Sequence, residues 1–324
     1  MSGRSKKTTD LLAVQNLCVE YYTRGSAIRA VDEVSFTLRK GEAIGIAGES
    51  GCGKSTLALS LLRVLPPNGR IVSGSITLEG KDLIAMGEEQ FRKEVRWKEI
   101  SMIFQGAMNV LNPIMKVGKQ ITETMIVHQG ISKTDAREQA RKLMPLVGLS
   151  PERLDNYPHE LSGGIKQRIV IALALSCNPK LILADEPTTA LDAITQTQVF
   201  QTINDLRREL QVSVILVSHD IAALSAFCDR INIMYAANFV ESNTVHEIVN
   251  SPLHPYTKAL LSSVPTLKKE KISSIPGSAA NIASPPSGCR FHPRCPYAFE
   301  LCRTARPSTF SRGKEGTVAC YLYK

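Results

Sequence analysis

The stretch Gly48-Glu-Ser-Gly-Cys-Gly-Lys-Ser55 decides the fold of this chain of 324 residues. It matches the pattern G-x-x-x-x-G-K-[ST] and follows an apolar run, 43–47, of the kind that forms a strand buried on both faces. A helix is expected directly after it, from about 54 to 65. Glycines allow main-chain N–H groups to curl around phosphate oxygens, and a helix N-terminus adds partial positive charge. The strand, loop and helix together predict a phosphate-binding loop rather than a chance glycine turn before a lysine.

Two residues of this loop have expected roles of their own. Lys54 is expected to reach the β- and γ-phosphates of a nucleotide, and the hydroxyl of Ser55 is expected to coordinate Mg²⁺. The residues predicted to surround the nucleotide are Gly48, Ser50, Gly51, Cys52, Gly53, Lys54, Ser55 and Thr56.

A second apolar stretch, Leu181-Ile-Leu-Ala-Asp185-Glu186, ends in two carboxylates. In open α/β sheets, ligands bind beyond the ends of the strands. Because adjacent residues of a strand point to opposite sides, the two acids should have separate tasks. Asp185 is predicted to hold Mg²⁺, and Glu186 is predicted to polarise the attacking water. A solvated turn is the alternative, and the phosphate loop upstream makes it the weaker interpretation.

Short apolar runs and helical patterns alternate around these motifs. Strands are expected at 13–22, 31–38, 181–184, 212–217 and 231–235, and helices at 135–147, 164–177, 193–210 and 221–228. Ser132 with Asp135 forms the start of a capping box. The alternation predicts an α/β fold with parallel strands covered by helices on both faces, and a helical subdomain inserted at about 85–165. A change of texture near 254 predicts two domains, 11–253 and 254–324.

The composition is that of an ordinary globular protein, with 43% hydrophobic and 21% charged residues, which excludes disordered and collagen-like chains. The apolar runs are too short to span a bilayer, and no apolar secretion signal follows the basic N-terminus, so a reducing cytosol is expected. The net charge of +9 is uneven, with +2 in 1–10 and +5 in 289–324. We interpret this as a basic arm and a small basic module rather than a nucleic-acid-binding face.

Leu161-Ser162-Gly163-Gly164 distinguishes the chain from other phosphate-loop enzymes, because it resembles the signature of ATP-binding cassette (ABC) ATPases. The resemblance covers most of 11–250 and implies a RecA-like core with a β subdomain and an inserted helical subdomain. In that family the signature caps a helix that faces the γ-phosphate of ATP held by the opposite subunit. Ser162 is therefore expected to serve a nucleotide bound by a partner cassette. Ile165 stands at the next position, where glutamine is common in the family. An apolar residue there is usual in the peptide-importer branch.

Further residues match this family in order along the chain. Gln105 resembles the glutamine that senses Mg²⁺ or water, and His219 resembles the switch histidine on the γ-phosphate. Tyr21 resembles the aromatic residue that stacks on adenine, with the adjacent Tyr22 as a rival. The loop that crosses between cassettes corresponds to Ala190, Leu191 and Asp192. The resemblance thus implies Glu186, His219 and Lys54 as catalytic residues, and Ser55, Gln105 and Asp185 as ligands of Mg²⁺.

Four cysteines, Cys289, Cys295, Cys302 and Cys320, lie near the C-terminus. They lack the paired C-x-x-C spacing of a zinc ribbon, so their spacing does not identify a metal. The stretches 253–260 and 288–297 resemble the C-terminal extension of ATPases from dipeptide and oligopeptide importers. That resemblance implies a [4Fe–4S] cluster on the four thiolates, with zinc or no metal as the alternatives. A structural clamp is expected, and a redox sensor is the competing interpretation.

The resemblance implies an ATPase that lies at the cytoplasmic face of the membrane and drives the import of peptides. It implies three kinds of partner: a second, different ABC ATPase, two transmembrane permease subunits and an extracytoplasmic solute-binding protein, with no nucleic acid. Oligosaccharide or nickel uptake stays open, because no residue of this chain is expected to contact the cargo. A soluble ABC ATPase acting on ribosomes or DNA is a weaker alternative, because the chain has one phosphate loop and no sustained heptads.

Overall fold

The computed structural model describes residues 10–23, 25–106, 110–189, 191–263, 275–313 and 315–324. The chain divides into two compact units, each built from several segments. The first unit comprises 1–11, 38–42 and 79–215, and the second comprises 12–37, 43–78 and 216–324. Among the described residues, no helix is both long enough and apolar enough to cross a bilayer.

Helices dominate the first unit. Its strands β6 and β7 are parallel, with Ile100 opposite Leu181 and Ile103 opposite Ala184. Both strands are buried along their whole length, as parallel strands covered on both faces should be. The elements of this unit are β5 (Lys81–Asp82), α2 (Glu88–Glu94), β6 (Ile100–Ile103), α3 (Val117–Gln129), α4 (Lys133–Leu146), the 3₁₀ helices η2 (Pro151–Asp155) and η3 (Pro158–Glu160), α5 (Gly163–Leu175), β7 (Leu181–Asp185) and α6 (Ala193–Leu210).

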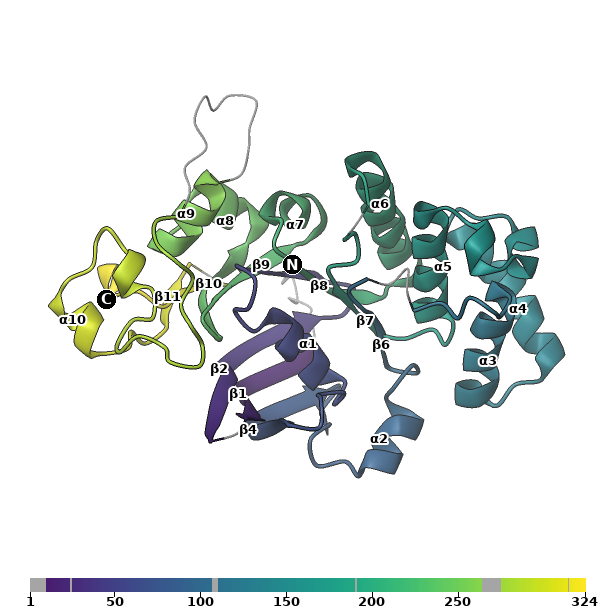
Figure 1. The fold of residues 1–324 in the computed structure, drawn as a ribbon, viewed down its shortest axis with the longest axis horizontal. Coiled ribbons are helices and arrows are strands. Elements are labelled where there is room, and N and C mark those ends of the chain that lie inside the picture. The colour runs from purple at the N-terminus through teal and green to yellow at the C-terminus, as the bar shows by residue number, and fades with distance from the viewer. Residues whose placement is uncertain (1–9, 24, 107–109, 190, 264–274, 314) are drawn as a thin grey trace, which may run out of the picture. The chain divides into compact units, whose positions relative to one another are not determined.

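Helices α3, α4 and α5 pack against one another as a helical layer (Figure 1). The apolar residues of α4 that are buried, Ala136, Ala140, Leu143 and Met144, follow the spacing of one helix face. Helix α4 begins two residues before the predicted position, because Ser132 caps it and accepts a hydrogen bond from the Asp135 N–H at 3.1 Å. The role of Ser132 and Asp135 at the start of this helix, predicted from the sequence, is therefore confirmed.

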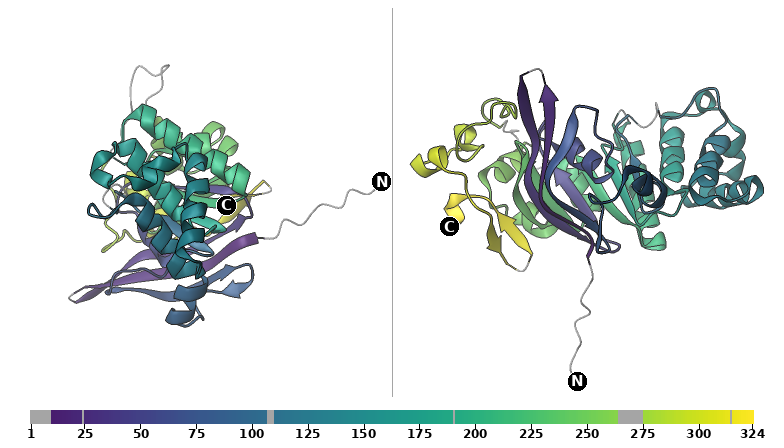
Figure 2. Two further views of the ribbon diagram at one scale, coloured as in Figure 1. Left: turned by 90° about the vertical axis from the view of Figure 1, so that its right-hand side faces the viewer. Right: turned by 90° about the horizontal axis from the view of Figure 1, so that it is seen from below.

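The second unit contains a long antiparallel sheet with the strand order β2-β1-β4 (Figure 2). Its strands are β1 (Asp10–Thr23), β2 (Ser26–Arg39) and β4 (Gly69–Leu78). Leu12 of β1 lies opposite Leu78 of β4, and the register shifts between Gln15 and Cys18. Asn16 has a left-handed backbone there, with φ of 46°, which is the local signature of a β-bulge.

A second set of strands in this unit is mixed in direction. β3 (Ala43–Ala47) and β9 (Arg230–Tyr235) are parallel, whereas β10 (Asn238–Thr244), β12 (Gly316–Val318) and β11 (Phe310–Arg312) continue antiparallel from β9. The prediction of parallel strands is confirmed for β3 and β9 and is wrong for this edge. The reason is the two-residue turn Ala236-Ala237, whose left-handed φ angles of 43° and 72° make a tight hairpin between β9 and β10.

The C-terminal region is joined to β2 by ion pairs around the buried Asp32. Asp32, whose side chain is 3% exposed, pairs with Arg290 at 2.5 Å and with Arg306 at 2.7 Å, and Arg29 contacts its other oxygen at 3.2 Å. Burial raises the pKa of Asp32, but Arg306 and Arg290 outweigh it, so the net pKa lies below the usual value.

The remaining elements of the second unit are α1 (Lys54–Leu61), α7 (Ile221–Phe227), α8 (Val245–Asn250), α9 (Pro255–Ser262), η4 (His292–Arg294), α10 (Glu300–Thr304) and η5 (Tyr321–Tyr323), while β8 (Ser213–Ser218) has residues in both units.

Candidate functional site

The phosphate loop follows β3 and leads into α1, as predicted. A side chain at Gly48 would place its Cβ 2.2 Å from the carbonyl oxygen of Met234, and one at Gly53 would come within 2.2 Å of the carbonyl oxygen of Ala30. Gly53 also has φ of 112°, which side-chain-bearing residues rarely adopt. These two glycines are therefore required by the backbone of the second unit, and they create a cradle that any Cβ would fill.

Lys54, the first residue of α1, folds back over this cradle. Its side chain is buried, and its Nζ donates hydrogen bonds to the carbonyl oxygens of Gly48 at 2.8 Å and Glu49 at 2.9 Å. Cys52 accepts the Ala237 N–H through its own carbonyl at 2.8 Å, and burial raises the pKa of its thiol. The structure thus gives Cys52 a local packing role and leaves Lys54 as the cation of the loop.

Tyr21 lies beside the loop helix, whereas Tyr22 points to solvent. The hydroxyl of Tyr21 is 3.3 Å from the hydroxyl of Thr56 in α1. Tyr22 is 46% exposed and pairs through its hydroxyl with Glu20 at 3.4 Å. His219 is exposed and follows β8 directly. Of the two tyrosines, Tyr21 is the one that the second unit brings to the phosphate loop.

The carboxylate pair lies at the end of β7 in the first unit. Asp185 is buried, and Glu186 has a left-handed backbone with φ of 45°. The side-chain amide of Gln105 donates to Glu186 Oε2 at 2.9 Å. Two residues predicted separately, 81 positions apart in the sequence, are therefore in contact. Thr189, which the sequence did not single out, also donates to Glu186 Oε2, at 3.2 Å.

The signature residues begin helix α5. Ser162 occupies the N-cap position, yet its exposed side chain makes no capping hydrogen bond to the helix. Gly164 approaches α6 closely, because a Cβ there would lie 2.8 Å from the methyl group of Thr195. The side chain of Ser162 is thus exposed and does not cap its own helix, and a helix N-terminus of this kind favours an anion.

Asp192 has a local role that the sequence analysis did not assign. It is the N-cap of α6, and its carboxylate accepts hydrogen bonds from the N–H groups of Ile194 at 3.1 Å and Thr195 at 3.0 Å. The hydroxyl of Thr195 adds a third bond at 2.6 Å, and this is the main reason that the pKa of Asp192 lies below its usual value. Leu191 is half-buried, and Ala190 lies outside the described residues.

The four C-terminal cysteines line one cavity of the second unit, together with His254 and His292. All four are free thiols, and burial raises the pKa of Cys289 to about 11, with the neighbouring cysteines adding to the shift. Gly288 carries the chain past this cavity with φ of 62°, because a Cβ there would lie 2.5 Å from the carbonyl oxygen of Cys302. Across the described part of the chain, no group of three or more His, Cys, Asp or Glu residues is placed so that it could hold one metal ion.

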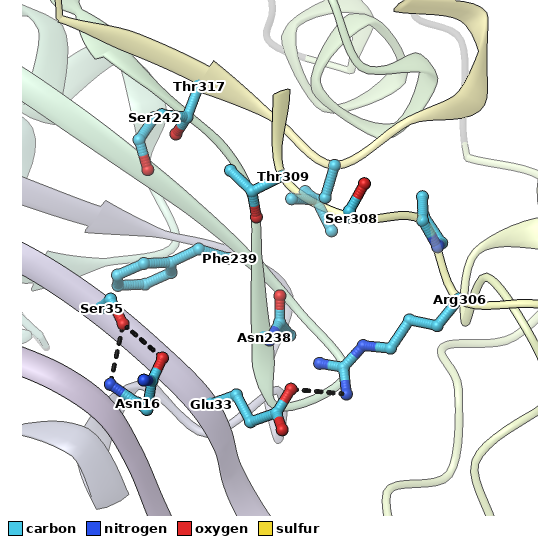
Figure 3. A pocket seen from close by; sticks show the side chains of 13 residues that line it. Asn16, Glu33, Ser35, Asn238, Phe239, Ser242, Arg306, Ser308, Thr309 and Thr317 are labelled. Carbon is cyan, nitrogen blue, oxygen red and sulfur yellow. Dashed lines mark hydrogen bonds and ion pairs between the residues drawn. The ribbon is translucent and has the colours of Figure 1, made fainter. Parts of the chain in front are cut away.

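A larger hollow of about 580 Å³ lies elsewhere in the second unit, between β1, β2, β10 and the segment 306–309 (Figure 3). Residues that line it contact one another: Ser35 Oγ accepts from the main-chain N–H of Asn16 at 2.8 Å, and a guanidinium nitrogen of Arg306 lies 3.8 Å from a carboxylate oxygen of Glu33. None of the predicted nucleotide or cysteine residues is among the described residues that line it. It is therefore separate from the phosphate loop.

Sequence reasoning missed the partners of Glu49, the second residue of the phosphate loop. Its N–H donates to the hydroxyl of Tyr256 at 2.9 Å, and Arg294 donates to both oxygens of its carboxylate, at 2.7 and 3.0 Å. Tyr256 and Arg294 belong to the two stretches, 253–260 and 288–297, that resemble an importer extension. The signal available in the sequence was Glu49 itself, because a carboxylate inside a phosphate-binding loop predicts a cationic partner.

The chain also matches known proteins along most of its length. Residues 31–189 match the family model described as ABC transporter, and 240–302 match the one described as oligopeptide/dipeptide transporter, C-terminal region. It is 44% identical to the oligopeptide transport ATP-binding protein AppD of Bacillus subtilis, over 97% of each chain. It is 41% identical to the dipeptide transport ATP-binding protein DppD of Caldanaerobacter subterraneus, again over 97% of each chain. This chain belongs to the oligopeptide and dipeptide group of ABC transporter ATP-binding proteins.

Relatives of this group extend to other organisms and to solved structures. The oligopeptide transport ATP-binding protein OppD of Salmonella typhimurium is 42% identical, over 94% of this chain and 92% of its own. The dimeric ATP-binding cassette MJ0796, solved with ADP and phosphate, superposes with a TM-score of 0.64 and 27% identity, covering 72% of this chain and 98% of that one. The predicted α/β ABC fold and the ATPase class are thereby confirmed.

Membership of this ABC group implies ATP and Mg²⁺, and the residues present fit both. Gly48 and Gly53 form a cradle that a Cβ would fill, with the cation of Lys54 folded over it. The predicted ligands of Mg²⁺, namely Ser55, Gln105 and Asp185, offer hydroxyl, amide and carboxylate oxygens, which are the donors that this hard cation takes.

Proposed function

We propose that this chain is the ATP-hydrolysing, energy-coupling subunit of an importer for peptides. The observation that carries the proposal is the match of both the cassette and the C-terminal region to oligopeptide and dipeptide ATP-binding proteins, at 41% identity or more over 97% of the chain. Uptake of an oligosaccharide or of nickel by the same machinery is the alternative. The test is uptake of labelled di- and oligopeptides by cells that lack the gene. Peptide uptake that is restored by the wild type and not by the Lys54→Ala variant supports the proposal. Cells without the gene that lose nickel uptake but keep peptide uptake contradict it.

The proposed roles at the nucleotide follow from the chemistry of each side chain. Lys54 neutralises the β- and γ-phosphates, together with the main-chain N–H groups of Gly48, Ser50, Gly51, Cys52 and Gly53. Ser55, Gln105 and Asp185 hold Mg²⁺, which supplies charge neutralisation when bound. Thr56 and Tyr21 bind the adenine end of the nucleotide, and Tyr21 stacks on the adenine ring. These roles are supported by the fold-back of Lys54 and by the contact of Tyr21 with Thr56.

Hydrolysis needs a group that positions water, and we assign it to Glu186. Its contact with Gln105 at 2.9 Å supports this role, because a hydrogen bond from an amide fixes the direction of the carboxylate. His219 contacts the γ-phosphate. Leu161, Ser162, Gly163 and Gly164 serve the ATP of a partner cassette, and Leu191 with Asp192 lies in the loop that crosses to that partner, as does Ala190. The outward-facing side chain of Ser162 supports the assignment in trans.

The proposed partners are a second ABC ATPase, a paralogue rather than a copy, two permease subunits and an extracytoplasmic binding protein. The chain then works at the cytoplasmic face of the membrane as a peripheral subunit. We also propose the domain division 11–253 for the ATPase, with its helical subdomain at about 85–165, and 254–324 for the extension. Copurification of the intact complex from cells that produce it naturally, followed by mass determination of each subunit, tests the pairing.

We propose that Cys289, Cys295, Cys302 and Cys320 hold a [4Fe–4S] cluster. All four thiols line one cavity and are unlinked by disulfides. A single zinc ion would need its ligands about 2.3 Å from one point, whereas a cubic cluster accepts thiolates spread around a larger body. Anaerobic purification followed by metal analysis tests the proposal. About four irons per chain support it, whereas colourless protein with one zinc per chain overturns it.

A further inference from the structure

The contacts of Glu49 show that the C-terminal region holds the phosphate loop. All three polar groups of Glu49 are engaged: its N–H by the hydroxyl of Tyr256, its carbonyl oxygen by Lys54 at 2.9 Å, and its carboxylate by Arg294. Arg294 lies 245 positions along the chain from Glu49 and binds both of its carboxylate oxygens, which is the strong, directional form of an arginine–carboxylate pair.

Arg294 is itself fixed in place. Its side chain is 5% exposed, and its Nε donates to the carbonyl oxygen of Pro276 at 2.7 Å. The guanidinium carbon lies 5.8 Å from the ring centre of Tyr235 and 6.0 Å from that of Phe291. A guanidinium stays charged in proteins, whatever its surroundings. The cation that meets Glu49 is therefore rigid and permanent.

Tyr256 is held just as firmly. Its side chain is fully buried, with its ring centre 4.6 Å from that of Tyr235 and 5.4 Å from that of Phe291. It lies in the first turn of α9, where His254 caps the helix by accepting the Tyr256 N–H at 3.0 Å. Burial raises the pKa of the Tyr256 hydroxyl, so it remains protonated and its oxygen accepts the Glu49 N–H.

We infer that Arg294 and Tyr256 are positioning residues of the phosphate loop and set the affinity of this chain for a nucleoside triphosphate. A carboxylate in this loop has the same sign of charge as the phosphates and opposes their binding. Arg294 neutralises that carboxylate, while Tyr256 fixes the main chain at Glu49. The loop is thereby preorganised before ATP arrives, which reduces the ordering cost of binding. This inference rests on the proposed assignment of 48–56 as the nucleotide site.

The experiment measures binding of a non-hydrolysable ATP analogue with Mg²⁺ to the full chain by calorimetry, together with KM and kcat of the assembled ATPase. Arg294→Met is expected to weaken binding and raise KM by about tenfold, while kcat changes by less than about twofold. Adding Glu49→Gln to Arg294→Met should restore most of the affinity, because no unpaired carboxylate remains. A role in stability alone predicts wild-type affinity for the folded Arg294→Met protein, so the binding measurement itself separates the two roles.

The matched control is Arg306→Met, which removes an arginine of the same region that pairs with Asp32 rather than with the loop. Its nucleotide affinity should equal that of the wild type. Unchanged affinity in Arg294→Met, beside a loss in Lys54→Ala, overturns the inference and leaves the proposed function intact. Unchanged affinity in Lys54→Ala overturns the assignment of the site itself.

Two further variants keep the buried volume and test the same contacts if Arg294→Met does not fold. Arg294→Lys retains the charge but loses the bidentate contact with the Glu49 carboxylate. Tyr256→Phe removes only the oxygen that accepts the Glu49 N–H. Each is expected to weaken binding by about three- to tenfold. Wild-type affinity in both variants overturns the inference.

Discussion

Glu186 has a backbone conformation that few side-chain-bearing residues adopt, with φ of 45°. Thr189 supports it twice, because its N–H and its hydroxyl both donate to the carbonyl oxygen of Glu186, at 3.2 and 3.1 Å. Conformations of this kind persist where the surroundings hold them, often at functional sites. The side chain is consequently aimed by its own turn as well as by Gln105.

We expect Glu186→Gln to lower the rate of ATP hydrolysis by about 10²- to 10⁴-fold, as loss of a general base does. ATP binding should persist, because the phosphate-binding groups of the loop are untouched. Steady-state turnover and equilibrium binding of ATP, measured on the same preparation, check both halves of this prediction. Turnover within about twofold of the wild type would remove Glu186 from its role.

At this scale, sequence reasoning reached the residues whose motifs are local and missed those whose partners are distant. Lys54 and Glu186 stand in short patterns of neighbouring residues, so their roles could be proposed without coordinates. The pairing of Glu49 with Arg294 joins residues 245 positions apart, and no spacing rule connects them. The cap formed by Asp192 is local, with partners two and three residues away, and it was overlooked because the residue had been assigned to a family motif.

Among the elements, helix α4 depends on its first residue. Ser132→Ala is expected to cost about 0.5–2 kcal/mol of unfolding free energy, because the Asp135 N–H loses its acceptor. The midpoint of thermal unfolding should fall by a few degrees, on the order of 2–4 °C for each kcal/mol. Ser150→Ala is the matched control, since Ser150 precedes η2 without a side-chain capping bond. Equal midpoints for the two variants would contradict the role of Ser132.

An ion network near the start of β7 gives a pH dependence. Hydrogen bonds from Lys180 and Lys40 lower the pKa of Glu79 to about 2. A carboxylate with a lowered pKa in the folded state adds stability above its unfolded pKa, near 4.5, and loses it as the pH falls toward 2. The pair is partly exposed, so the gain is about 1 kcal/mol or less.

The variant Glu79→Gln should therefore be less stable than the wild type by a constant amount between pH 7 and 5. The difference should narrow below about pH 4.5 and shrink in high salt. Thermal unfolding across this pH range measures it. Glu89→Gln, which removes an exposed pair with Lys93 on α2, is the control and should change little. A gap that widens in acid would contradict the sign of the shift.

Several of the elements that sequence patterns failed to predict are short or polar. Strands β11 and β12 have three residues each, too few to show an alternating pattern. Strand β10 carries Asn238, Glu241, Ser242 and Asn243, which disfavour a strand by composition, and the tight turn before it is what places it. The apolar, fully buried strands β3 and β7, by contrast, lie where they were predicted.

For the whole molecule, the signature predicts that one chain serves the nucleotide of another. Ser162→Arg should leave ATP binding by the isolated chain unchanged and lower turnover of the assembled transporter by about 10²-fold or more. Calorimetry on the isolated chain and phosphate release by the complex measure the two effects. Weaker binding by the isolated Ser162→Arg chain would show that Ser162 serves its own nucleotide instead.

Strand β12 lies along β10, where Glu241 faces Val318 and Ser242 faces Thr317, and β11 lies beyond it. The last residues of the chain thus cover hydrogen-bonding groups of β10 that would otherwise be an open strand edge. A chain shortened before β11 would expose that edge to pairing with other molecules. Truncation after α9 is therefore expected to cause self-association and loss of soluble protein, even though every nucleotide motif would still be present.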